Sequence, residues 1–479
     1  MRVSRRVSLC FVAVLALSGA AGTAHADEPV AAREPALMSE TAEVTSVVDA
    51  FDKDDPFDLN IVLGFNQSWK TAKIRRESQL PQPGLEGSPS SGQAGFIPAT
   101  ENIASYSSSM SVLNLGADVG LYHDLALILR VPVILAWSQK LTDLDGSSSV
   151  ASQILADPAG GQLFSVPSTS PTRSGIDTIN FGADWAIFNQ QRDFTKPTWV
   201  IGVEGRVAVG APLHACTVVN GTNACFNPGG PPINRDPGIS KGFNSLIAKT
   251  VWSRRFGYVE PYTGIWVQAD FANGSSDFGK WNPAQDLDRS PPLTGSYVLG
   301  LEVVPYEARE QFQRLSADFR FKGTYHSPGR DYSELFDQLG SSTATSLTTP
   351  NPSAYTASPT GKSVVDQGAE SVYFSGVTEQ AAYGSFTING SATWQTGPYI
   401  KFTLGAGLTY AQSHLITSAD VCTPNGNTNP ALAGPCTQNG QVQGVPNPDH
   451  RDIIDLPGHR FSVDDTLIVD LYAMGVVMF

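Results

Sequence analysis

Serines that stand beside histidines are the residues of this sequence best suited to act as a nucleophile and its general base. Two such neighbours are His326-Ser327 and Ser413-His414, both near the ends of alternating segments. A serine nucleophile needs a histidine within hydrogen-bond reach to take its proton. Neighbours in a strand point to opposite faces, so neither pair can work as it stands. We therefore predict no enzyme activity and expect solvent around these histidines.

Two close pairs of cysteines follow residue 26, Cys216 with Cys225 and Cys422 with Cys436, each inside a segment rich in Gly, Asn and Pro. Neither pair has the tight C-x-x-C spacing of zinc sites, so we predict no metal and no cofactor. Three pairings are formally open, and pairing within each segment closes small loops. We expect these local disulfides to form in an oxidising compartment.

The first residues have the three parts of a secretory signal: three early arginines, an apolar run over 9–22, and Ala-His-Ala ending at Ala26. Cys10 lies inside the apolar run, which argues against a lipid anchor at the cleavage site. Cleavage after Ala26 would leave 479 − 26 = 453 residues and a formal charge of −14 − 3 = −17. Such a charge argues against nucleic-acid binding.

Residues 27–56 carry nine acids against Arg33 and Lys53. We interpret them as a polar N-terminal segment in the periplasm, with a short helix over 41–51. No later stretch of 18 residues is uninterruptedly apolar, so no helix is predicted to cross a bilayer. That leaves a soluble exported protein or a β-barrel, the other fold that satisfies every backbone group in lipid.

Apolar and polar residues alternate with a period of two in a series of segments, which predicts strands. They are 57–69, 112–122, 125–139, 179–188, 199–209, 243–253, 259–271, 297–304, 315–325, 386–394, 400–410 and 465–479. Short and long linkers take turns between them, as in bacterial barrels with short periplasmic turns and long outer loops. The sequence therefore predicts an all-β fold over 57–479, a transmembrane antiparallel up-and-down barrel of about twelve strands.

A soluble antiparallel sandwich would alternate in the same way. Its solvated faces should be rich in Lys and Glu, whereas the second faces here are mostly Gly, Ser, Thr and Asn. In the third segment we expect Leu125, Leu127, Leu129, Val131, Val133, Leu135 and Trp137 to face outward. Pro132 interrupts that strand and cannot donate to the ladder, which predicts a bulge or local break.

The last residues, from Leu471 to Phe479, resemble the terminal signal by which outer-membrane barrels are recognised for insertion, with Phe479 as its aromatic end. The resemblance implies the bacterial outer membrane, with lipid, lipopolysaccharide and the barrel-assembly machinery as partners. Residues 174–212 resemble the strand-turn-strand pattern of predicted outer-membrane transporters associated with degradation of phenol and other aromatic compounds. That resemblance covers under a tenth of the chain and implies the barrel, not the substrate.

The polar faces of the strands should line the barrel lumen, and their charges are nearly balanced at eight acids and six bases. They are Asp118, Asp184, Glu204, Glu260, Asp270, Glu302, Asp318, Asp470, Arg130, Arg206, Lys249, Arg320, Lys322 and Lys401. Two interpretations stay open: an interior closed by salt bridges, because unpaired charges there are costly, or a polar path with weak or slightly cation-favouring selectivity.

These features favour a channel or transporter that passes small solutes across the outer membrane. Twelve strands enclose more space than side chains alone fill, and less than the wide pores of larger barrels. The alternative is a non-transporting surface or envelope protein whose disulfide-bonded loops bind a partner. The long loops 327–383 and 418–458 bear on the choice, and the first is long enough to fold inward as a plug.

Overall fold

In the computed structural model the following residues are described: 41–50, 58–81, 96–144, 153–216, 218–219, 222–223, 238–274, 276–278, 290–352, 355–357, 363–365, 368, 371–424, 437–438, 441–442 and 444–479.

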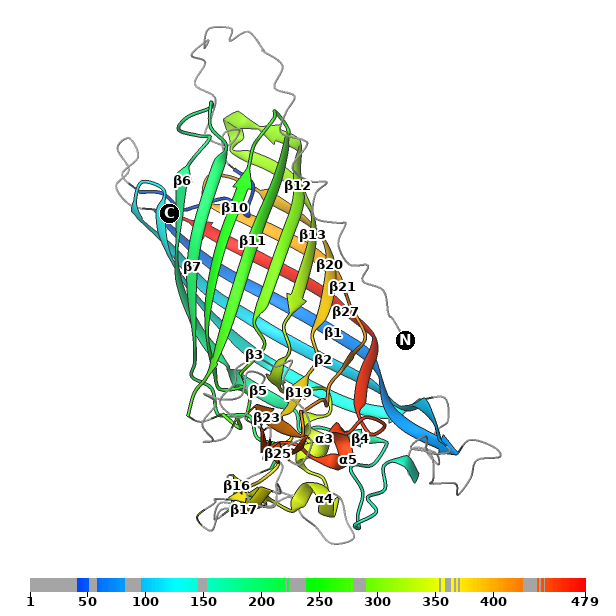
Figure 1. Cartoon of the computed structure of the whole chain (residues 1–479). Helices are drawn as coiled ribbons and strands as arrows, with labels where there is room; N and C mark the ends of the chain where they lie inside the picture. The colour runs from blue at the N-terminus through cyan, green and yellow to red at the C-terminus, as the bar shows by residue number, and fades with distance from the viewer. Residues whose placement is uncertain are drawn as a thin grey trace, which may run out of the picture.

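Twelve long strands form one closed antiparallel barrel (Figure 1). In chain order they are β1 (Leu59–Pro81), β2 (Phe96–Tyr122), β3 (Leu125–Asp143), β6 (Thr178–Phe188), β7 (Thr198–Ala208), β10 (Phe243–Ser253), β11 (Val259–Ala272), β12 (Thr294–Ala308), β13 (Gln313–His326), β20 (Tyr383–Gln395), β21 (Ile400–Ala411) and β27 (Phe461–Met478). Each pairs with the next, and β1 also pairs with β27, which removes the open edge. The predicted barrel and its strand number are confirmed.

Most strand ends lie within a few residues of the prediction, and β10 matches it at both ends. The large differences are in β1 and β2, which pair as far as Pro81 with Phe96, well beyond the predicted limits at Trp69 and Val112. Polar residues occupy both faces of these extensions, so the period of two is lost from the sequence. The few apolar residues of these extensions, including Ala72, Ile74 and Tyr106, are buried in one cluster with residues of the long linkers.

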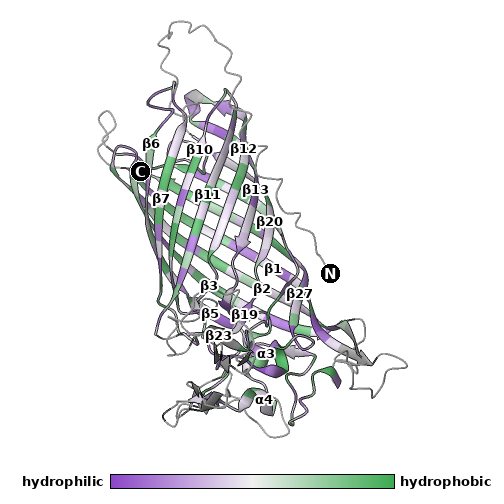
Figure 2. Cartoon of the chain, in the orientation of Figure 1, coloured by the Kyte–Doolittle hydropathy of each residue, from purple (hydrophilic) through white to green (hydrophobic). Residues whose placement is uncertain are grey.

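Hydrophobic residues recur along every strand of the barrel (Figure 2), and many of the large ones are exposed on its outer surface. Large side chains such as Leu63, Phe181 and Leu404 are more than half exposed and face away from the lumen. Exposed aromatic side chains lie near both ends of the strands: Trp185, Tyr258, Tyr306, Tyr399 and Phe479 at the short turns, and Phe271, Tyr325, Phe386 and Tyr410 at the long loops. An apolar band between two aromatic girdles is the outer surface of an outer-membrane barrel. The chain lies in the bacterial outer membrane, as predicted.

The outward direction predicted for Trp137 is wrong. The register between β2 and β3 shifts at Ser111/Val112, so that Leu135 is an extra residue on β3. A bulge of this kind moves every later side chain to the other face. Leu127, Leu129 and Leu135 point outward, whereas Trp137 is partly buried. Pro132 itself stays paired to β2, but the ladder from β3 to β6 ends just before it, at Arg130.

The long linkers fold together beside one end of the barrel, at the bottom of Figure 1, and form what we call the extracellular cap. It contains β4 (Ser168–Thr169), β5 (Arg173–Ile176), β8 (Val218–Val219), β9 (Thr222–Asn223), β14 (Gly329–Asp331), α3 (Phe336–Gly340), α4 (Thr345–Thr348), β15 (Asn351–Pro352), β16 (Tyr355–Ala357), β17 (Ser363–Val365), β18 (Ser371–Val372), β19 (Thr378–Gln380), β22 (His414–Leu415), β23 (Cys422–Pro424), β24 (Thr437–Gln438), β25 (Gln441–Val442), β26 (Gly444–Pro446) and α5 (Asp452–Asp455). The short helix η3 (Arg309–Gln311) lies in the turn between β12 and β13 at the other end.

An apolar core joins three separate linkers of the cap. Leu163, Leu339 and Ile454 come from the linkers after β3, β13 and β21, and they pack in one buried cluster with residues of the barrel rim. The side chains of Arg173 and Asp337 form two hydrogen bonds of 2.9 and 2.6 Å and are almost inaccessible. No helix among the described residues is long and apolar enough to cross a membrane.

The chain before β1 enters the barrel from the end with short turns. Residues 41–50 form a single turn, closed by a 2.8 Å hydrogen bond from Thr45 N to Ala42 O, and then an extended stretch. The helix predicted over 41–51 is therefore wrong for 41–50. This stretch bonds to the barrel wall, and so short a helix has little stability of its own. The signal peptide and the rest of the acidic segment lie outside the described residues.

The predicted disulfides also lie partly outside the described residues. Cys216 is buried in the cap. Cys225 and Cys436 fall outside the described ranges, as does the side chain of Cys422. Both local pairings stay predictions.

Candidate functional site

A cavity of about 730 Å³ lies inside the barrel, on the side of the cap. Strands β6, β7 and β10 contribute charged side chains to its lining, and strands β12, β13, β20 and β21 contribute hydroxyls and one lysine, Lys322. The lining also includes Lys70, Lys241 and Asp270, and the cap residues Asp331, Tyr332, Glu334 and Gln380. We call this space the outer cavity. Described residues of the linker 327–383 reach the cavity from the cap.

Most charges of the outer cavity are paired with each other. Lys249 Nζ lies 2.6 Å from Asp184 Oδ2, and Arg206 Nε lies 2.6 Å from Glu204 Oε1. Lys241 Nζ donates to both carboxylate oxygens of Asp331, at 2.8 and 3.1 Å. Lys70 forms an ion pair with one carboxylate oxygen of Glu334 in the cap.

A second cavity, of about 210 Å³, lies toward the short turns, and we call it the inner cavity. Residues 43, 44 and 46–48 of the N-terminal segment form part of its lining. The two cavities share three lining residues, Ile128, Asp184 and Lys249. The Asp184–Lys249 ion pair therefore stands between them and narrows the lumen.

Gly202 makes room for that ion pair. A Cβ atom at this position would lie 2.1 Å from Asp184 Oδ1 and 2.4 Å from Lys249 Cε. No side chain fits there unless the ion pair moves, which explains a glycine on the lumen side of β7.

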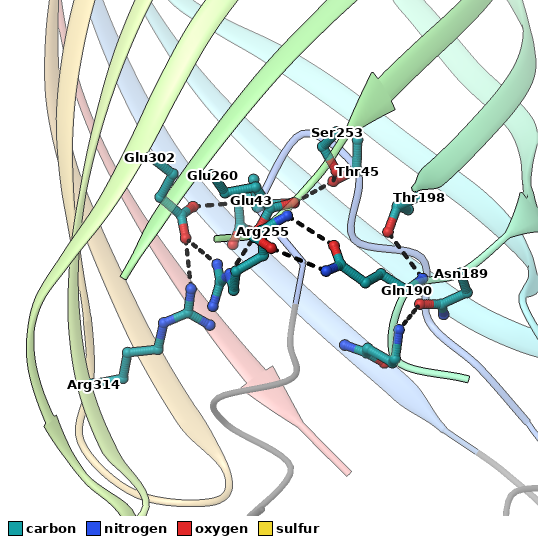
Figure 3. A network of polar contacts seen from close by, with 12 residues as sticks. Glu43, Thr45, Asn189, Gln190, Thr198, Ser253, Arg255, Glu260, Glu302 and Arg314 are labelled. Atoms are coloured by element: carbon teal, nitrogen blue, oxygen red, sulfur yellow. Dashed lines mark hydrogen bonds and ion pairs between the residues drawn. The ribbon is translucent and has the colours of Figure 1, made fainter. Parts of the chain in front are cut away.

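The N-terminal segment is held at the inner end by a network of buried charges (Figure 3). Arg255 binds Glu260 at 2.8 Å and Glu302 at 3.0 Å, and Arg314 binds Glu302 at 2.5 Å. The second oxygen of Glu302 accepts a 3.2 Å hydrogen bond from the backbone N–H of Glu43. The barrel wall thus uses one of its own buried carboxylates to bind the inserted chain.

Further contacts fix the rest of the segment. Thr45 and Ser253 share a buried hydroxyl hydrogen bond of 2.9 Å, and Lys401 pairs with Glu43 at 3.3 Å. Ala50 exchanges two backbone hydrogen bonds of 3.0 Å with His123. The segment passes so close to Gly120 that a Cβ atom there would lie 1.8 Å from the carbonyl oxygen of Asp49.

The structure places the predicted lumen charges in several groups. Asp118 pairs with Arg130 at 2.5 Å, and both line the inner cavity with Lys401. Asp318 binds Arg320 at 3.1 Å and accepts a 2.6 Å hydrogen bond from Tyr262. The others divide between the outer cavity (Asp184, Glu204, Arg206, Lys249, Asp270 and Lys322) and the buried network (Glu260 and Glu302). Asp470 lies beside Gly407 and borders neither cavity.

The expectation that His326 and His414 are solvated in loops is wrong. Both line the outer cavity, and their rings stack on the two faces of Tyr383, with centroids 4.3 and 3.8 Å apart. Ser327 and Ser413 lie just outside the strands that hold these histidines, so the separation of each serine from its histidine stays a prediction. No group of three or more potential metal ligands occurs among the described residues.

Several residues of the site were absent from the prediction. Lys70 and Arg314 lie one residue beyond predicted strand limits, on the correct face, and extending the alternation would have found them. Lys241, Asp331 and Glu334 come from linkers, where no periodicity marks a residue that returns to the lumen.

No family model and no curated protein matches the chain. An outer-membrane channel, COG4313, of Pseudomonas putida F1 is 8% identical over 87% of this chain and 96% of its own, with a TM-score of 0.33. A FadL homologue of Pseudomonas aeruginosa is 8% identical over 87% and 90%, with a TM-score of 0.29. The channel DcaP of Acinetobacter baumannii is 11% identical over 90% and 100%, with a TM-score of 0.21. At identities and TM-scores this low, none of these proteins indicates the function of this chain.

Proposed function

We propose that this chain is an outer-membrane channel for small polar solutes, that it is not an enzyme, and that its N-terminal segment closes the periplasmic end. One observation carries the proposal: two polar cavities follow each other along the lumen and share the Asp184–Lys249 pair as their boundary. A barrel with a purely structural or surface-binding role has no need of this hydrated path. The resemblance of residues 174–212 to transporters of aromatic degradation supports the barrel in this proposal, and no aromatic substrate is proposed.

In this proposal the path is closed at one point. Asp184 and Lys249 are flexible side chains that can separate without any change in the wall. The N-terminal segment is backbone, and it must leave the mouth before solute can pass. It is held by hydrogen bonds and ion pairs from β10, β12, β21 and the turn after β2. Its release is therefore the step that opens the channel.

Conductance in planar bilayers tests the proposal with a variant that expels the segment. In Gly120→Ala the new methyl group overlaps the carbonyl oxygen of Asp49, so we expect a sustained current well above that of the parent chain. Gly64→Ala is the matched control, because its Cβ would make an ordinary 3.5 Å contact with Asn114. Labelling of Ser46→Cys from the periplasmic side should rise with the current.

The proposal fails if neither Gly120→Ala nor deletion of 41–50 produces a current while the barrel assembles. Deletion of the linker 327–383 covers the case in which the cap also blocks the path. If all these proteins stay closed and removal of the cysteine-containing loops abolishes binding of cells or ligands, the surface-protein alternative replaces the channel.

A further inference from the structure

Lys322 differs from the other cations of the outer cavity. It follows the lumen-facing alternation of β13, in which Lys322, Thr324 and His326 all line the cavity. Its charged neighbours are Arg206 and Arg320, which have the same sign. Within the described part of the chain, Lys322 has no carboxylate at ion-pair distance. Its ammonium group brings three donors and no acceptor to the cavity.

The wall around Lys322 supplies further hydrogen-bond donors. Ser296 shares a 2.9 Å hydrogen bond with Thr324, and Thr387 shares a 2.8 Å hydrogen bond with Thr409. Each pair has two hydroxyl hydrogens and uses one of them internally. One hydrogen of each pair is therefore left for water or for a ligand that accepts it, next to an ammonium group that also needs an acceptor.

The carboxylates of the outer cavity form ion pairs or hydrogen bonds with groups other than Lys322. Asp184, Glu204, Asp331 and Glu334 each hold a cation. Asp270 accepts a 2.8 Å hydrogen bond from Gln268 and lies within electrostatic reach of Lys241, on a different strand from Lys322. The charge balance of the whole lumen thus conceals a local excess of positive charge and of donors on β13 and its neighbours.

We propose that the outer cavity binds a small organic carboxylate, with its anionic group on Lys322 and on the spare hydroxyls of the Ser296–Thr324 and Thr387–Thr409 pairs. The inference rests on the proposed function, since it names the substrate class for the same lumen. A carboxylate supplies the negative charge that Lys322 lacks nearby, and charge-assisted hydrogen bonds of this kind are the strong ones. Arg206 adds a second positive charge nearby without having to give up Glu204.

Ligand-observed NMR on the full-length protein in detergent tests the inference, with L-lactate as the probe and L-lactamide as its neutral counterpart. We expect saturation transfer to lactate and little to lactamide. Lys322→Gln should weaken lactate binding at least about fivefold, because the attraction of one opposite charge in a partly screened site is lost. Lys322→Arg should keep it, and Lys140→Gln, which removes an exposed charge outside the cavity, should leave it unchanged.

Equal binding of lactate and lactamide, or lactate binding that survives Lys322→Gln, would overturn the inference. Heat-modifiable migration on gels shows whether each variant has assembled. If Lys322→Gln does not assemble, the double variant Thr324→Val and Thr387→Val takes its place and should weaken lactate binding severalfold. Binding needs no current, so a protein that binds lactate but never conducts contradicts the channel and not the carboxylate site.

Discussion

The two ends of the lumen both hold ion pairs, but the surroundings of those pairs differ. At the periplasmic end the side chains of Glu260, Glu302 and Arg314 are between 1% and 7% exposed, under an inserted piece of the chain. In the outer cavity the side chains of Glu204 and Arg206 are 33% and 38% exposed. Ion pairs of the same kind are therefore buried at the periplasmic end and partly exposed in the outer cavity.

This difference in burial gives the two ends different roles in the proposed channel: the buried network holds the inserted chain, and the exposed pairs can bind solute. A buried charge cannot lose its partner without a large cost, so the network around Glu302 is fixed and holds the inserted chain in place. A hydrated pair contributes little to stability and can exchange its partner for water or solute. The lumen therefore has a rigid inner end and an adaptable outer end.

The largest effect that would test this comparison is expected from Glu302→Ala. It leaves Arg255 and Arg314 buried without the carboxylate between them, and we expect a loss of about 3–5 kcal/mol in the free energy of unfolding. Urea unfolding in lipid vesicles, followed by the heat-modifiable gel shift, measures it.

Glu204→Ala is the control for that experiment at the wet end. It removes the partner of Arg206 in hydrated surroundings, so we expect a loss of no more than about 1 kcal/mol. Equal losses in the two variants would contradict the distinction between the two ends.

The sequence predicted the wall of the barrel far better than its contents. Lipid requires an apolar residue at every second position, so strands such as Phe243–Ser253 are visible in the sequence. The same period placed Asp184 and Lys249 in the lumen, and their ion pair follows from register across β6, β7 and β10. The bulge at Leu135 was misplaced because Pro132, the only visible signal, lies three residues earlier.

The closure of the inner end could not be predicted in this way. Glu43 belongs to an acidic segment whose composition suits the periplasm, and only its contacts with Glu302 and Lys401 place it in the barrel. His326 and Tyr383 stack because β13 and β20 pair them directly, which places them opposite each other only when the register of two strands joined by a long linker is known. His414 joins them from the linker after β21. Contacts of this kind join segments that are far apart in the sequence, and the alternation of residues within one strand does not predict them.

A smaller effect is expected in the extracellular cap, where a buried acid has no strong ion pair. Burial raises the pKa of Asp455 to about 6, although the charge of His450 and hydrogen bonds from the backbone N–H groups of Ala419 and Arg451 lower it. A raised pKa favours the folded cap below the ordinary pKa of Asp, and this stabilisation is lost as the pH rises through 6. The cap should therefore be more stable at pH 5 than at pH 7.5, by about 1.5 kcal/mol.

Hydrogen exchange of the cap amides, corrected for the intrinsic rate at each pH, measures this dependence. Asp455→Asn cannot ionise and should show a nearly flat profile, although it loses one acceptor and is less stable overall. An unchanged profile in that variant would assign the pH dependence to another group.

The smallest effect concerns one hydrogen bond of the inserted chain. Thr45→Val removes the hydroxyl that meets Ser253 at 2.9 Å and leaves a buried serine hydroxyl without its partner. We expect the bound state of the segment to lose about 1–1.5 kcal/mol, which raises the open fraction about tenfold. Single-channel recording measures that fraction directly. Thr409→Val breaks a hydroxyl pair of similar length in the hydrated outer cavity. Since water replaces the lost partner there, the open fraction should stay the same, and a comparable rise in both variants would mean that the inserted segment does not control opening.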